Sequence, residues 1–225
     1  MKFYNKKVVM SDPFYHRYYL PDMSFKEYIT RENFFRKIDG GEDEIIKAIN
    51  TDYLDICNDY FTSDILFYDE LSKYLLDDNM QFKPLDELIF FKICYYAIKL
   101  LNILYDGHNF LEDERQKFIQ NNYDAAIIAL SKSQFHDAEA FFQYKNNILQ
   151  ICYKFGTIEH IFEFHGVKEW KEKEFMKIKP KLWVEELYEE NQGVFVYNTL
   201  WTHEDIEDVG CSELTVEFTK LIQVK

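Results

Sequence analysis

The chain has 225 residues, 47% of them hydrophobic, and a formal net charge of -14 at pH 7. This length and apolar content predict one domain with a large core and exclude a disordered acidic tail. The negative charge disfavours direct contact with nucleic acid or anionic membranes and favours basic protein partners. With 7 Gly and 4 Pro, the composition predicts helices with short connections.

The N-terminal 38 residues are basic and rich in aromatic side chains. They predict a short strand at 6–10, a turn at 21–24, and a helix that begins at Phe25 with Ser24 as its cap. No apolar signal segment is recognised in the first 20 residues, and no apolar run reaches the ~18 residues typical of a membrane span. We therefore expect a cytoplasmic protein.

Residues 39–78 hold the sharpest charge block, with twelve acidic and two basic residues. Apolar residues recur at three- and four-residue spacing from Ile45 to Tyr60, which predicts an amphipathic helix with its acids on another face. A second helix is predicted at about 63–76. The acidic side chains of this block that we assign to a partner-binding face are Asp52, Asp55, Asp59, Asp64, Asp69 and Glu70.

An almost uniformly apolar helix is predicted at 85–105, in the centre of a bundle, with Gly107 as its stop. Further predicted helices cover about 112–130, 137–155, 157–165 and 167–179.

After Pro180 the pattern changes to β-branched and alternating residues, which predict strands at 193–201 and 214–224. The expected fold is therefore α+β but predominantly α-helical. It has six to eight helices within 25–179 and a small C-terminal antiparallel β element within 181–225, in a single domain of residues 1–225. A second acidic stretch between the two strands supplies a second candidate binding surface, made of Glu204, Asp205, Glu207 and Asp208.

Histidines give one possible metal centre. His136 and Asp137 follow His108 by 28 residues in helical surroundings. This spacing resembles the opening of HD-type metal phosphohydrolases, in which a His, a His-Asp pair and a later Asp hold a divalent metal. The resemblance covers these three residues and implies a metal-dependent phosphohydrolase as an alternative function.

Other reactive residues do not form a recognisable motif. On the predicted helix, His165 lies about 140° from His160, so these two do not converge with Glu163 on one ligand site. The four cysteines lie far apart and are interpreted as reduced thiols, with Cys211 in the most polar surroundings. No phosphate loop, CxxC, HExxH or GxSxG occurs. We assign no catalytic residue, no metal ligand and no cofactor.

The sequence therefore favours a non-enzymatic, acidic binding protein with a basic protein partner. Its most concrete form is an immunity protein that neutralises a cognate bacterial toxin, such as a nuclease, by occluding the active site. Complementary charge accelerates such an association and fixes its register. Besides the HD-like phosphohydrolase, a DNA mimic that inhibits a nucleic-acid enzyme is a further alternative. The partner's identity and the oligomeric state stay open.

Overall fold

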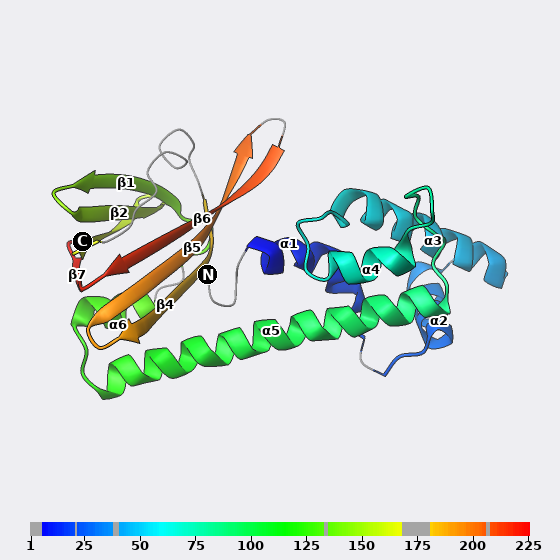
Figure 1. Ribbon diagram of the computed structural model, residues 1–225, viewed down its shortest axis with the longest axis horizontal. Helices are drawn as coiled ribbons and strands as arrows, with labels where there is room; N and C mark the ends of the chain where they lie inside the picture. The colour runs from blue at the N-terminus through cyan, green and yellow to red at the C-terminus, as the bar shows by residue number, and fades with distance from the viewer. Residues whose placement is uncertain (1–5, 21, 38–40, 133–134, 168–180, 206–207) are drawn as a thin grey trace. The chain divides into compact units, whose positions relative to one another are not determined.

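The structure is a computed structural model, which describes residues 6–20, 22–37, 41–132, 135–167, 181–205 and 208–225 (Figure 1). For residues 6, 9, 183–184, 202–205 and 208–212 it describes the backbone alone. The described residues divide into two compact units, one within 7–105 and one within 106–225. Each unit has a hydrophobic core of its own. We call them the helical unit and the sheet unit.

The helical unit contains the N-terminal helices and the first half of a long helix. Its elements are α1 (Lys6–Tyr15), the 3-10 turn η1 (His16–Tyr18), α2 (Phe25–Arg36), α3 (Glu42–Tyr60), α4 (Tyr68–Leu75) and the part of α5 (Glu87–Gln120) up to residue 105. The helix predicted at 63–76 begins at Tyr68 instead, after an irregular connection.

The strand predicted at 6–10 is wrong, because these residues form helix α1. The aromatic residues that follow explain the difference. Phe14, Tyr15 and Tyr18 are almost completely buried in the helical core, and the Tyr15 hydroxyl donates to the carbonyl of Leu66 at 2.8 Å. Tertiary packing of this segment therefore overrides the β propensity of its valines. The N-terminal aromatic segment belongs to the core.

Helix α2 begins as predicted. The Ser24 hydroxyl accepts from the backbone N–H of Glu27, and the Glu27 carboxylate accepts from the backbone N–H of Ser24. This reciprocal pair is a capping box, which satisfies two donors that a helix start leaves unpaired. The cap predicted from sequence is confirmed.

Helix α5 runs through the predicted stop at Gly107, which lies buried inside it. A glycine inside a helix costs about 1 kcal/mol relative to alanine, and packing of the helix residues before and after it can offset this cost. Phe110 packs against Tyr188 and Phe118 is completely buried, so the part of α5 after residue 105 packs within the sheet unit. By length and composition α5 could cross a membrane, a property that core helices of soluble proteins share.

The sheet unit is built around one antiparallel sheet with the strand order β6-β5-β4-β1-β2-β3-β7 in its described part. The sheet is curled, and residues of helix α6 (Ala125–Lys132) join its core. The strands are β1 (Glu139–Lys145), β2 (Ile148–Phe155), β3 (Ile158–His165), β4 (Lys181–Asn191), β5 (Val194–Asp205), β6 (Asp208–Phe218) and β7 (Lys220–Gln223).

The predominantly helical fold class is therefore wrong. Residues 137–155 and 157–165, predicted as helices, form strands β1 to β3. In β2, Leu149, Ile151 and Tyr153 are buried while the residues between them are only half-buried, which is the period-2 pattern of a strand. Short runs with several aromatic residues fit both periods, and long-range pairing decides between them.

The C-terminal strands are confirmed, although their bounds differ. The segment predicted at 193–201 falls in β5 from Val194 onwards, and most of the segment at 214–224 is divided between β6 and β7. These strands are part of the large sheet rather than a small separate element. The helix predicted at 167–179 lies outside the described residues.

Candidate functional site

Helix α3 places its acidic residues by burying its opposite face. Ile45, Ile49, Tyr53 and Cys57 are buried and recur every four residues. The residues between them must face outwards or sideways, so Asp55 and Asp59 are exposed, whereas Asp52 is half-buried. The predicted acidic side of this helix thus exists, but its three members differ in environment.

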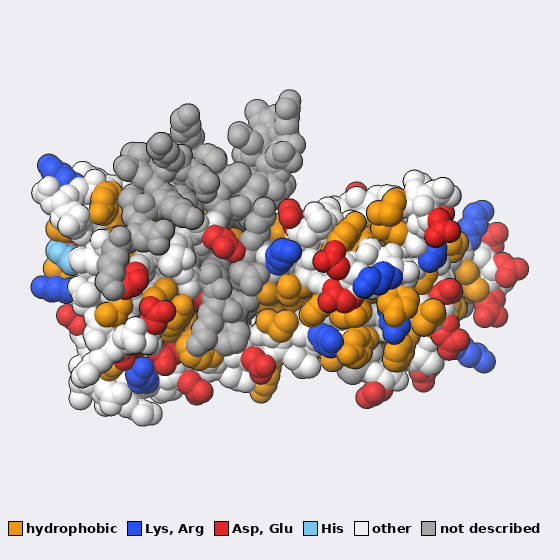
Figure 2. Space-filling view, viewed as in Figure 1, with side chains coloured by type: hydrophobic (Ala, Val, Ile, Leu, Met, Phe, Trp, Pro, Cys, Tyr) orange, Lys and Arg blue, Asp and Glu red, His pale blue; other side chains and the backbone are white. Residues whose placement is uncertain are grey.

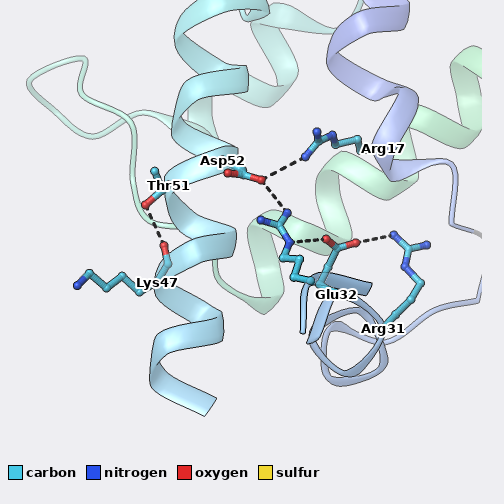
Figure 3. A network of polar contacts seen from close by, with 7 residues as sticks. Arg17, Arg31, Glu32, Lys47, Thr51 and Asp52 are labelled. Atoms are coloured by element: carbon cyan, nitrogen blue, oxygen red, sulfur yellow. Dashed lines mark hydrogen bonds and ion pairs between the residues drawn. The ribbon is translucent and has the colours of Figure 1, made fainter. Parts of the chain in front are cut away.

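Asp52 is engaged in a network of ion pairs within the helical unit (Figure 3). Its Oδ2 atom lies 2.7 Å from Nη2 of Arg36 and 3.5 Å from Nη1 of Arg17. Arg36 also contacts Glu32 at 2.9 Å, and Glu32 contacts Arg31 at 3.1 Å. Asp52 therefore ties α3 to α2 and η1, and its charge is largely neutralised by its neighbours.

Asp55 and Asp59 differ from Asp52 in this respect. Neither makes an ion pair within 4.0 Å of another described residue. Their side chains point into solvent, where they keep their charge available to a partner. We call Asp55 and Asp59 the α3 acidic pair.

Helix α4 presents two more of the predicted acids. Asp69 and Glu70 are exposed and occupy its first turn, where the positive end of the helix dipole favours carboxylates. Asp64 is also exposed but lies in the connection before α4, where its backbone N–H donates to the Thr62 hydroxyl at 3.4 Å. On the face drawn in Figure 2, acidic side chains of the helical unit alternate with basic and hydrophobic ones.

The second candidate surface is only partly described. Glu204 and Asp205 lie at the end of β5 and Asp208 begins β6, but their side chains are outside the described part of the structure. Glu207 lies outside the described residues altogether. Cys211 has a described backbone in β6 and no described side chain.

The histidines named above lie on different elements. His108 is exposed on α5, while His136 and Asp137 are exposed before β1 and contact each other at 3.0 Å. His165 and Glu163 lie on one face of strand β3, and Nε2 of His165 is 3.4 Å from Oε2 of Glu163. His160 lies on the opposite face, because side chains alternate along a strand. Among the described residues, no group of three or more His, Cys, Asp or Glu could hold a metal ion.

The described cysteines Cys57, Cys94 and Cys152 are free thiols. Burial raises the pKa of Cys57 to about 12 and the pKa of Cys94 to about 11. A thiol reacts as its thiolate, so both are held in the unreactive form at neutral pH.

Sequence reasoning missed a buried polar network in the core of the sheet unit. The Tyr197 hydroxyl donates to the Glu185 carboxylate at 2.7 Å, and the hydroxyls of Tyr153 and Tyr197 are 2.7 Å apart. Because Tyr197 uses its one proton on Glu185, Tyr153 is the donor to Tyr197. The backbone N–H of Phe135 donates to the same carboxylate at 3.4 Å.

Burial raises the pKa of Glu185 from 4.5 to about 7, against the opposing effect of the Tyr197 hydrogen bond. The residue as a whole is half-buried, whereas its carboxyl group is enclosed. A carboxyl group with this pKa could exchange a proton near neutral pH. The nearby hollow of about 320 Å³ is lined by Phe135, His160 and Phe162 but not by Glu185. We interpret the network as part of the core.

Strand β4 also buries an acid on its other face. Glu186 is 1% exposed and accepts from the Asn198 side-chain N–H at 3.2 Å, and the Thr215 hydroxyl donates to Oδ1 of the same Asn198 side chain at 2.8 Å. The adjacent acids Glu185 and Glu186, in an acidic chain, gave no sequence signal of burial.

No protein-family model matches this chain, and no curated protein or solved structure is detectably similar to it.

Proposed function

We propose that this protein is a non-enzymatic, cytoplasmic binding protein that docks a basic protein partner through acidic side chains of helices α3 and α4. The observation that carries the proposal is the α3 acidic pair. Asp55 and Asp59 are exposed and have no ion-pair partner among the described residues, although basic side chains are common in the same unit. Uncompensated charge of this kind steers a cationic partner and fixes its orientation.

Neighbouring acidic residues add further exposed carboxylates to the α3 acidic pair. Asp69 and Glu70 add exposed carboxylates at the start of α4, and Asp64 adds another between the two helices. Asp52 is excluded from the docking set, because its charge is already used by Arg36 and Arg17. The most concrete form of the proposal is an immunity protein that covers the cationic active site of a toxin, such as a nuclease.

The proposal is tested by charge reversal at matched places. The partner is captured from the native host with the tagged protein, identified by mass spectrometry, and purified. Asp55→Lys with Asp59→Lys should weaken its binding by about tenfold or more at low salt, because two attractive charges become repulsive. The difference should shrink at high salt, where exposed charges are screened.

The control is Asp113→Lys with Glu190→Lys, two exposed acids of the sheet unit. It changes the net charge of the protein by the same amount and should leave affinity within about twofold. Equal losses for both double variants would show general charge attraction and contradict a defined docking face. A host extract from which no basic protein is retained would contradict the proposal itself.

A further inference from the structure

The helical unit carries an apolar groove that the acidic docking face does not include. It has a volume of about 410 Å³ and is lined by residues 20 and 22–25 together with the first turns of α5. Phe25 and Phe90, whose ring centroids are 5.4 Å apart, belong to its lining. Phe91, Tyr95 and Ile98 line it from α5. We call it the α5 groove.

Helix α5 carries an apolar stripe, and its members Phe91, Tyr95 and Ile98 line this groove. Leu88, Phe91 and Tyr95 are exposed by 55%, 62% and 46%. Together with Ile98 they follow a spacing of three, four and three residues, which is the spacing of a helix seam that packs against another helix. Large exposed side chains in such a row are typical of an interaction surface rather than of a solvated helix face.

The described charged residues that line the groove, Asp22 and Glu87, are both acidic and both exposed. Lys92 and Lys99, the basic residues of this part of α5, lie over aromatic rings of Tyr74 and Tyr95, at 4.7 Å and 4.5 Å from the ring centroids. A ligand of the groove is therefore expected to be apolar along one side and positively charged at its edges.

We propose that the α5 groove binds an amphipathic helix of the cationic partner. Apolar side chains of that helix, at three- and four-residue spacing, enter the groove between Phe25 and Phe91. Its Lys or Arg side chains meet Asp22 and Glu87. An apolar face laid into a hydrophobic groove is a common mode of helix recognition, and the volume is within the range of ligand sites. This inference rests on the proposed function and adds an apolar anchor to its electrostatic steering.

The first test uses three synthetic helical peptides and the complete protein. The probe peptide has Leu at alternating three- and four-residue spacing and Lys elsewhere on its exposed face. One control peptide replaces Lys with Glu, and the other replaces Leu with Ser. Fluorescence anisotropy should show that the probe binds at least about tenfold more tightly than either control, because each lacks one of the two required features. Equal binding of the probe and the Ser peptide would overturn the proposal.

The second test locates the binding on the protein. Phe91→Gln with Tyr95→Gln should weaken probe binding by about tenfold, because it removes two exposed aromatic contacts of the groove. The matched control is Phe34→Gln with Phe35→Gln, which removes two aromatic residues of α2 that are 77% and 69% exposed. It should leave probe binding unchanged. Equal effects of the two double variants would overturn the assignment to the groove.

The outcome is separable from that of the proposed function. If the purified partner loses affinity on reversal of the α3 acidic pair but not with Phe91→Gln and Tyr95→Gln, the docking face stands and the groove inference fails. If neither double variant affects it, both fail. Dimerisation of the free protein that Phe91→Gln with Tyr95→Gln abolishes would also overturn the inference, because a second copy would then occupy the groove.

Discussion

The environment of Glu185 links the ionisation of its carboxyl group to the stability of the sheet unit. A carboxyl group enclosed among aromatic side chains is disfavoured in its charged form. Two hydrogen bonds, from Tyr197 and from the backbone of Phe135, compensate only part of that cost. The result is a pKa of about 7 in the folded protein, raised from 4.5.

The sign of the resulting pH dependence follows directly. The folded pKa is raised, so the stability that Glu185 contributes is complete below about pH 4.5 and is lost as the pH rises through about 7. Between these limits the sheet unit should lose stability on the order of 3 kcal/mol from this group. Glu185→Gln should flatten the dependence of the free energy of unfolding on pH. Urea unfolding from about pH 5 to about pH 8 measures it, because this range covers most of the interval between the two pKa values. An unchanged slope in the variant would contradict the assignment.

At the scale of elements, the turn between β1 and β2 holds the signal that the sequence analysis missed. Asn146 and Asn147 have φ values of 56° and 59°, as a two-residue type I′ hairpin turn requires. Gly156 and Gly193, at φ 57° and 75°, occupy the corresponding turns after β2 and β4. Asparagine and glycine adopt this conformation at low cost, so turn residues at short intervals indicated hairpins where the apolar spacing suggested helices.

Asn147 offers a direct test of this interpretation. Asn147→Val should destabilise the sheet unit by about 1–2 kcal/mol, because a β-branched residue is strained at positive φ. Asn147→Gly should be neutral or stabilising, although it also loses the 3.3 Å hydrogen bond from the Tyr144 hydroxyl. Urea unfolding followed by circular dichroism gives both values. A valine variant as stable as the glycine variant would exclude a left-handed conformation at this position.

Helices with a strong local signal were easier to predict. Ser24 with Glu27 identified the start of α2, and the spacing from Ile45 to Tyr60 identified α3. The candidate site followed from the same periodicity, since burial of one face of α3 exposes Asp55 and Asp59. The role of Asp52 did not follow, because Arg17 and Arg36 come from other elements and are brought to it only by the tertiary fold.

At the scale of the whole molecule, two separate cores predict two levels of stability. The helical and sheet units each bury their own large aromatic residues, for example Tyr53 in one and Tyr153 in the other. Peptide-resolved hydrogen exchange should therefore show that Asn147→Val lowers protection in strands β1 to β3 and leaves α3 unchanged. An equal loss of protection in α3 and in these strands would show that the units unfold as one.

The strong negative charge, the start of α2, the amphipathic helix α3 and the alternating C-terminal strands could be predicted from the sequence, because each of these is a local or compositional property. That residues 139–165 form three strands of the large antiparallel sheet, and that α5 continues through Gly107, became clear only from the tertiary structure. It also decided that Asp52 is paired while Asp55 is not, and that Glu185 is enclosed. These outcomes depend on contacts between residues distant in the chain, which periodicity within a short window does not contain.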